Sequence, residues 1–111
     1  MIPEDALDQI WRWADRKAPE HVRDEIRLEV DITDRTVTIL ECRPPWQPQY
    51  GPDWTRFAVA RLRYTNSRSR WSLYWRDRNL RFHEYDLAEL SPNVQGLLPE
   101  IDRDPTNIFW G

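Results

Sequence analysis

Cysteine, histidine and glycine are scarce in this chain. Its one cysteine, Cys42, excludes an intrachain disulfide and a zinc site built from several thiolates. Only three glycines are present, too few for a glycine-rich loop that cradles a phosphate. No segment approaches the roughly twenty apolar residues that a membrane-spanning helix needs. We therefore expect no membrane segment, a reducing compartment and a cytoplasmic location.

Aromatic and charged residues are plentiful. Seven Trp, four Tyr and three Phe supply much of the apolar content, so large rings must fill the core of what we expect to be one domain, residues 1–111. The net charge of -3 argues against general attraction to nucleic acid. Yet eight arginines and only one acid lie between Arg56 and Arg81. All basic residues except Lys17 are arginine, which suits contacts with planar anions and would equally follow from a GC-rich codon bias.

Helical periodicity is present near both ends of the sequence. In residues 3–17 apolar side chains recur every three or four positions, with acids in the first turn and bases in the last, and Pro19 ends the pattern. Residues 93–103 show the same spacing, although Gly96 and Pro99 interrupt it. The sequence predicts one helix in each of these places.

Between these helices, apolar and polar residues alternate with the period of two that β-strands have. The segments are 26–32, 37–43, a third that begins at about 54 or 57 and ends at 64, and two within 71–85. The loops that join most of them are short, which favours antiparallel neighbours. The predicted fold class is therefore α+β, with an N-terminal helix, a five-stranded antiparallel meander sheet and a C-terminal helix.

One alternation rule aligns the last three strands into a continuous apolar row. The pairs it predicts are Tyr64 with Trp71, Leu62 with Leu73, Ala60 with Trp75, Trp75 with Leu80 and Leu73 with Phe82. The last two pairs assume a tight turn at Asp77-Arg78. In the first hairpin, a four-residue loop at 33–36 places Val37 opposite Ile32.

The opposite face of the same strands is predicted to carry arginines among aromatic rings. Its members are Arg61, Arg63, Ser72, Tyr74, Arg76, Arg81, His83 and Tyr85. Guanidinium groups hold phosphates and rings stack on bases, so this face is a candidate for binding nucleic acid or another polyanion. The candidate binding residues are Arg61, Arg63, Tyr74, Arg76, Arg81 and His83. The alternative is an ordinary solvated face on which the arginines pair with acids from elsewhere in the chain.

Three tryptophans lie where no strand alternation buries them: Trp46, Trp54 and Trp110. If exposed, they are candidate hot spots for a protein partner or a second copy of the chain. The alternative is that they fold back and seal the edge of the core.

No catalytic, cofactor or metal site is predicted. His83 and Glu84 point to opposite faces of a strand, so their adjacency does not make a dyad. Cys42 lacks an identifiable base, and His21 is expected to be a structural or surface residue. Carboxylates such as Asp31 and Asp34 lack the glycine and final acid of a calcium loop. We expect no catalytic residue, no cofactor and no metal.

Several strings of residues are distinctive in combination. They are Glu41-Cys42-Arg43-Pro44-Pro45-Trp46, Trp71-Ser72-Leu73-Tyr74-Trp75, Leu80-Arg81-Phe82-His83-Glu84-Tyr85, Asp104-Pro105 and Phe109-Trp110-Gly111. With these strings, over nearly its whole length, the chain resembles a small bacterial family, domain-of-unknown-function family 3024. The resemblance implies a compact, stand-alone bacterial protein and brings no activity, substrate or catalytic residue.

The sequence thus leaves the biochemical function unknown and favours binding over catalysis. The first hypothesis is a protein-interaction or regulatory module, with a protein partner or a homo-oligomer. The alternative is a nucleic-acid or polyanion binder that uses the arginine face. The third is an enzyme whose site no local motif reveals.

Overall fold

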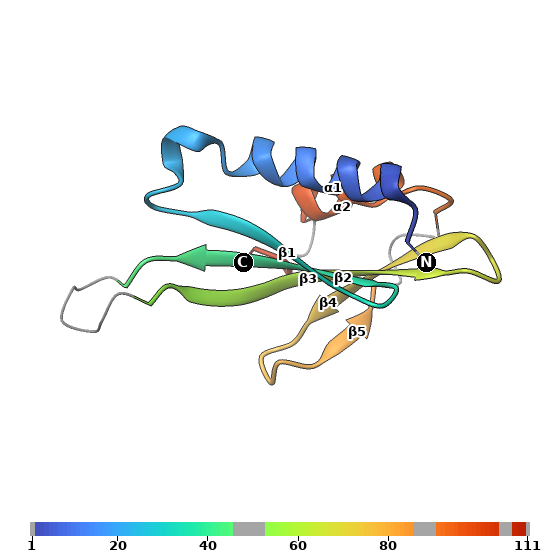
Figure 1. Ribbon diagram of the computed structural model, residues 1–111. Coiled ribbons are helices and arrows are strands. Elements are labelled where there is room, and N and C mark those ends of the chain that lie inside the picture. The colour runs from blue at the N-terminus through green and yellow to red at the C-terminus, as the bar shows by residue number, and fades with distance from the viewer. Residues whose placement is uncertain (1, 46–52, 86–90, 105–107, 111) are drawn as a thin grey trace.

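The computed structural model describes residues 2–45, 53–85, 91–104 and 108–110. In chain order its elements are α1 (Glu4–Lys17), the 3-10 turn η1 (Glu20–Val22), β1 (Arg27–Thr33), β2 (Thr36–Arg43), β3 (Thr55–Thr65), β4 (Arg70–Arg76), β5 (Phe82–Glu84), the 3-10 turn η3 (Val94–Gly96) and α2 (Leu98–Arg103). The strands form one antiparallel sheet in the order β1-β2-β3-β4-β5 (Figure 1). The predicted α+β fold is confirmed.

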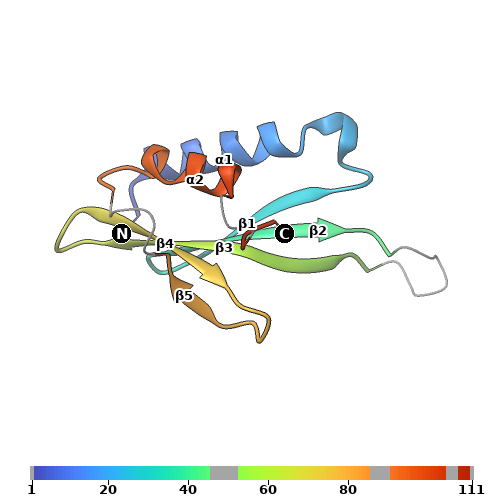
Figure 2. The ribbon, with the colours of Figure 1, turned by 180° about the vertical axis from the view of Figure 1, so that it is seen from behind.

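Both α-helices pack on the same face of the sheet, as the two opposite views show (Figures 1 and 2). The core between these layers contains large apolar side chains from both. They are Ile10 and Trp13 of α1, Val37 and Ile39 of β2, Leu62 of β3, Trp71 and Leu73 of β4, and Ile101 of α2. Burying a side chain of this size contributes roughly 1.5–3 kcal/mol to stability before its lost entropy is counted. None of the described helices is long and apolar enough to cross a bilayer.

Two predicted registers are confirmed. Ile32 pairs with Val37 in the first hairpin, where Asp34 takes a φ of 58° in the tight turn. The pairs predicted between β3 and β4 are all observed, including Leu62 with Leu73. Strand alternation predicts them because one face of these strands is buried under the helices, and a slip of one residue would expose every apolar side chain.

The predicted register of the last hairpin is wrong. Trp75 pairs with His83, and not with Leu80. The connection is a five-residue loop in which Asp77 Oδ1 accepts the backbone N–H groups of Asn79 at 2.8 Å and Arg81 at 3.0 Å. This carboxylate stabilises a longer loop than the tight turn that was assumed.

The longer loop exchanges the two faces of the last strand. Phe82 now shares a face with Tyr74, whereas Tyr85 is 3% exposed and belongs to the core. Leu80, predicted to be buried, takes a φ of 67° in the loop and is 67% exposed.

The predicted C-terminal helix is broken into η3 and α2. The four apolar residues of its periodic pattern are nevertheless all buried: Val94, Leu97, Leu98 and Ile101. Pro99 lies in the first turn of α2, where its missing N–H costs nothing. A Cβ on Gly96 would lie 2.3 Å from Ser91 Oγ, so the end of η3 needs a residue without a side chain.

Strand β3 contains a bulge. Ile39 pairs with Ala60 and the next residue, Leu40, pairs with Ala58, so Val59 is an extra residue in β3. Arg76, from β4, donates its Nε–H to the carbonyl oxygen of Ala58 at 2.7 Å. A bulge disrupts the ladder locally, and this side chain satisfies a backbone acceptor beside it.

Candidate ligand-binding face of the sheet

The face of the sheet opposite α1 and α2 is a surface of strand side chains, which we call the open face. None of the described helices lies across it (Figures 1 and 2). The register brings together on it Thr36, Thr38, Arg61, Arg63, Ser72, Tyr74, Phe82 and Glu84. Adjacent strands lie about 5 Å apart, so side chains on neighbouring strands touch.

A shallow depression of about 240 Å³ lies on the open face. Its walls are Thr36, Arg61, Arg63, Tyr74 and Phe82. Arg61 is fixed there by two contacts: its Nε–H donates to Thr38 Oγ1 at 3.0 Å, and its guanidinium lies 3.9 Å from the centroid of the Phe82 ring. A guanidinium that is already held in place loses less entropy when it binds an anion.

The two arginines of the depression are available for a ligand. Within the described ranges, no carboxylate lies within ion-pairing distance of Arg61 or Arg63. Arg61 belongs to a row of paired residues that runs across all five strands. The two ends of this row, on the edge strands β1 and β5, are the acids Asp31 and Glu84. The internal pairing that an ordinary solvated face would have is therefore not observed for these arginines.

Three of the six predicted binding residues lie together as expected, and three do not. Arg61, Arg63 and Tyr74 line the depression. Arg76 pairs with Phe82 and so belongs to the predicted face, but its guanidinium lies 4.0 Å from the centroid of the Phe57 ring and does not line the depression. Arg81 is an exposed residue of the loop before β5.

His83 is the clearest correction, because it lies on the helix side of the sheet. Its ring packs 4.9 Å from the ring of Trp75, and its Nε2 lies 2.7 Å from Asp77 Oδ2. The hydrogen bond from His83, with those from the backbone of Arg81 and Asn79, lowers the pKa of Asp77. The carboxylate therefore stays ionised and holds the loop.

Phe82 is the residue of the depression that alternation missed, because the wrong loop length placed it in the core. The available signal was Asp77 followed two residues later by Asn79, a pattern typical of a carboxylate that caps its own loop. A prediction with a five-residue loop at this position places Phe82 beside Tyr74.

Cys42 is also on the open face, and it is 1% exposed. Burial, followed by the nearby charge of Glu29, raises the pKa of its thiol, and Arg56 only partly opposes this shift. Arg56 instead pairs with Glu29 at 2.8 Å. A thiol with a raised pKa is a poor nucleophile, so the surroundings of Cys42 favour a packing role.

The three candidate anchor tryptophans differ in their structural surroundings. Trp110 Nε1 donates to the carbonyl oxygen of Ile101 at 2.8 Å, and the ring lies 6.4 Å from that of Trp13, so Trp110 closes the edge of the core. Trp54 is half-buried, with the Arg27 guanidinium 4.0 Å from its ring centroid. Trp46 lies outside the described residues.

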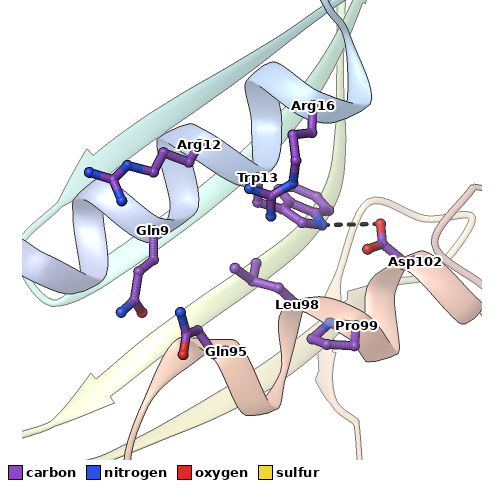
Figure 3. Close-up of a pocket in the computed structure, with 8 residues that line it drawn as sticks. All are labelled: Gln9, Arg12, Trp13, Arg16, Gln95, Leu98, Pro99 and Asp102. Atoms are coloured by element: carbon purple, nitrogen blue, oxygen red, sulfur yellow. Dashed lines mark hydrogen bonds between the residues drawn. The ribbon is translucent and has the colours of Figure 1, made fainter.

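A second concave site is a groove of about 270 Å³ between α1 and the segment of η3 and α2 (Figure 3). Gln9 and Gln95 extend toward each other across it. Asp102 Oδ1 accepts the indole N–H of Trp13 at 3.0 Å and pairs with Lys17 Nζ at 3.0 Å. The carboxylate of the groove is thus engaged in joining the helices.

No three His, Cys, Asp or Glu side chains gather into a possible metal site in the part of the chain that the structure describes.

The molecule is an α+β protein with an open antiparallel sheet whose free face carries a cationic, ring-lined depression. The chain belongs to the family described as Domain of unknown function (DUF3024), whose model matches residues 2–111. No curated protein and no solved structure matches it.

Proposed function

We propose that this protein binds single-stranded nucleic acid on the open face of its sheet. The observation that carries the proposal is the fixed Arg61 guanidinium, held by Thr38 and Phe82 and free of any carboxylate partner among the described residues. Arg63 and Tyr74 stand beside it in the same depression. Phosphate groups match the arginines, and an unstacked base matches the rings of Tyr74 and Phe82.

A single strand fits the open face better than a duplex. The surface is a broad sheet with a shallow depression, and none of the described helices projects from it into a groove. Sheet-based binders lay unpaired bases on exposed rings and hold the backbone with cationic side chains. The overall charge of -3 supports local and not general attraction, and Arg61 and Arg63 supply a local positive charge without a carboxylate partner among the described residues.

The alternative of a protein-interaction module has weaker support in the geometry. Two of its three anchor tryptophans, Trp54 and Trp110, already make contacts within the chain. Among the described residues, the exposed large apolar side chains come from separate elements: Trp11 from α1, Ile32 from β1, Phe57 from β3 and Leu80 from the last loop. A protein interface usually has one central cluster of anchors.

A bacterial cytoplasmic location is part of the same proposal. It is supported by the sequence resemblance and by Cys42, the only cysteine, which is free and buried. A chain with one thiol has no disulfide to maintain, which suits a reducing compartment.

The test is fluorescence anisotropy with labelled single-stranded RNA and DNA of about twelve nucleotides, within the usual range of site sizes. Binding should weaken as salt rises, with a logarithmic slope that reports several phosphate contacts. Arg61→Ala should reduce that slope by about 0.7, the value for one phosphate of a single strand. Phe82→Leu should weaken binding and leave the slope unchanged, because it removes a ring and no charge.

Two matched variants test the location of the strand. Arg12→Ala removes the same charge from α1, on the other face, and should change binding little. His83→Ala removes a residue that the register places on the helix side, and it should also leave binding nearly unchanged. Absence of binding at low salt, or equal losses from Arg12→Ala and Arg61→Ala, would contradict the proposal.

A further inference from the structure

A hollow of about 760 Å³ has Phe57 and Trp75 on its wall, and the register places both side chains on the helix side of the sheet. Aromatic residues from three parts of the chain line it: Phe57 of β3, Trp75 of β4, and Phe109 and Trp110 near the C-terminal end. The volume falls within the range of sites that hold small organic molecules. Flat rings on several walls suit a flat ring as ligand.

The rings of the hollow are held by contacts that do not depend on a ligand. Phe57 stacks with the guanidinium of Arg76, which is anchored to the Ala58 carbonyl oxygen. Trp75 is backed by the ring of His83, and Trp110 is held by its indole hydrogen bond to Ile101. Phe57 nevertheless stays 56% exposed, although Arg76 lies over its ring. A preformed site of this kind costs little ordering when it binds.

Two arginines that have no carboxylate partner in the described structure line the hollow: Arg76, which is held by Phe57 and the Ala58 carbonyl oxygen, and Arg78. Glu41, a wall residue, accepts from Arg43 Nε at 2.7 Å, and Asp77 is engaged by His83. Arg78, also on the wall, is exposed and has no carboxylate partner within the described ranges. The hollow therefore combines stacking surfaces with a guanidinium that is free to meet an anion.

We propose that this hollow binds a nucleotide, with the base against Phe57, Trp75 and Trp110 and the phosphate at Arg78. A purine or pyrimidine base supplies the flat ring, and its phosphate supplies the anion that a guanidinium binds through paired hydrogen bonds. The inference is independent of strand binding on the open face, because the two sites share no lining residue.

Calorimetric titration with adenosine and with AMP tests both parts of the site. AMP should bind more tightly than adenosine, and Arg78→Ala should remove that difference while adenosine binding remains. Phe57→Leu keeps an apolar side chain but removes the ring, and it should weaken both ligands by roughly tenfold. Leu80→Ala is the matched control, since it truncates another exposed apolar side chain that does not line the hollow.

The two proposed sites are separated by crossing the variants. Arg61→Ala should weaken strand binding and leave AMP binding unchanged, whereas Arg78→Ala should weaken AMP to the level of adenosine and leave strand binding unchanged. A free nucleotide and the terminal nucleotide of a strand have the same chemistry, so AMP is also added to the strand complex. Displacement of the strand would assign the hollow to a strand end, and its absence would assign it to the free nucleotide.

Indole N–H signals in NMR spectra provide the structural readout. Those of Trp75 and Trp110 should shift with AMP, while that of Trp71, which is 1% exposed and lies outside the hollow, should stay in place. Failure of AMP and adenosine to bind at millimolar concentration would overturn the inference. So would binding that neither Phe57→Leu nor Arg78→Ala changes.

Discussion

Tyr85 joins the last strand to the C-terminal helix through one side chain. Its hydroxyl donates to Glu100 Oε1 at 2.9 Å, and its ring lies 5.2 Å from that of Phe109. Tyr85→Phe removes the hydroxyl and leaves the carboxylate without this donor, which should lower the free energy of unfolding by about 1–2 kcal/mol. Urea unfolding of both proteins measures the difference, and equal midpoints would show that the bond contributes nothing.

The same hydroxyl makes stability depend on alkaline pH. Burial, and then the Glu100 carboxylate, raises the pKa of Tyr85 from 10.0 to about 12. The folded state therefore holds this proton more tightly than the unfolded state, so its contribution is complete below pH 10 and is lost as the pH rises through about 12. Wild-type stability should fall over this interval more steeply than that of Tyr85→Phe. Parallel curves would contradict the assignment.

Asp77 controls the last loop by accepting two backbone N–H groups and the His83 ring. Because these bonds lower its pKa from 3.8, the ionised carboxylate stabilises the fold above that pH, and the contribution is lost as the pH falls through the folded value. Asp77→Ala should reduce stability at neutral pH and flatten the acid limb of the pH profile. Asp77→Asn, which keeps an acceptor oxygen, should cost less at neutral pH.

At the scale of elements, the junction between η3 and the segment after β5 is tightly packed. Ser91 bridges to Trp71, and an added Cβ on Gly96 would lie 2.3 Å from Ser91 Oγ and 3.1 Å from Ser91 Cβ. Gly96→Ala should therefore destabilise the protein by about 1–3 kcal/mol, the usual cost of overpacking.

A double-mutant cycle separates packing from helix propensity at this junction. Ser91→Gly removes both close atoms, so Gly96→Ala in that background should be neutral or stabilising, as an alanine is in a helical turn. Chemical denaturation of the four proteins gives the coupling energy. A value near zero would mean that the cost of Gly96→Ala does not come from Ser91.

The register of strands with one buried face could be predicted from the sequence. A register that depends on hydrogen bonds from a side chain to the backbone could not. Alternation placed Arg61, Arg63 and Tyr74 on one face because their neighbours Leu62 and Leu73 must be buried. The last strand carries no such constraint on Leu80, so its register follows the bonds of Asp77. The hollow was also beyond prediction, because it unites rings from three distant segments.

At the scale of the whole molecule, the charge of the depression is opposite in sign to the net charge. The chain has a net charge of -3, yet the depression of the open face holds Arg61 and Arg63 without acids as partners in the described structure. Asp31 and Glu84 lie on the edge strands, at the two ends of the row of paired residues that contains Arg61. A phosphate bound at Arg61 would be repelled by both of them.

Neutralising these acids should tighten strand binding. Asp31→Asn and Glu84→Gln each remove one exposed charge, and each should lower the dissociation constant by about two- to fivefold at low salt. Asp8→Asn makes the same change on α1, across the sheet, where a screening length of about 10 Å at 0.1 M salt reduces the effect. At about 1 M salt, where the screening length is about 3 Å, the differences should vanish. If Asp8→Asn tightens binding as much as Glu84→Gln does, the effect comes from the net charge and not from repulsion near the bound phosphate. The strand would then not lie on the open face.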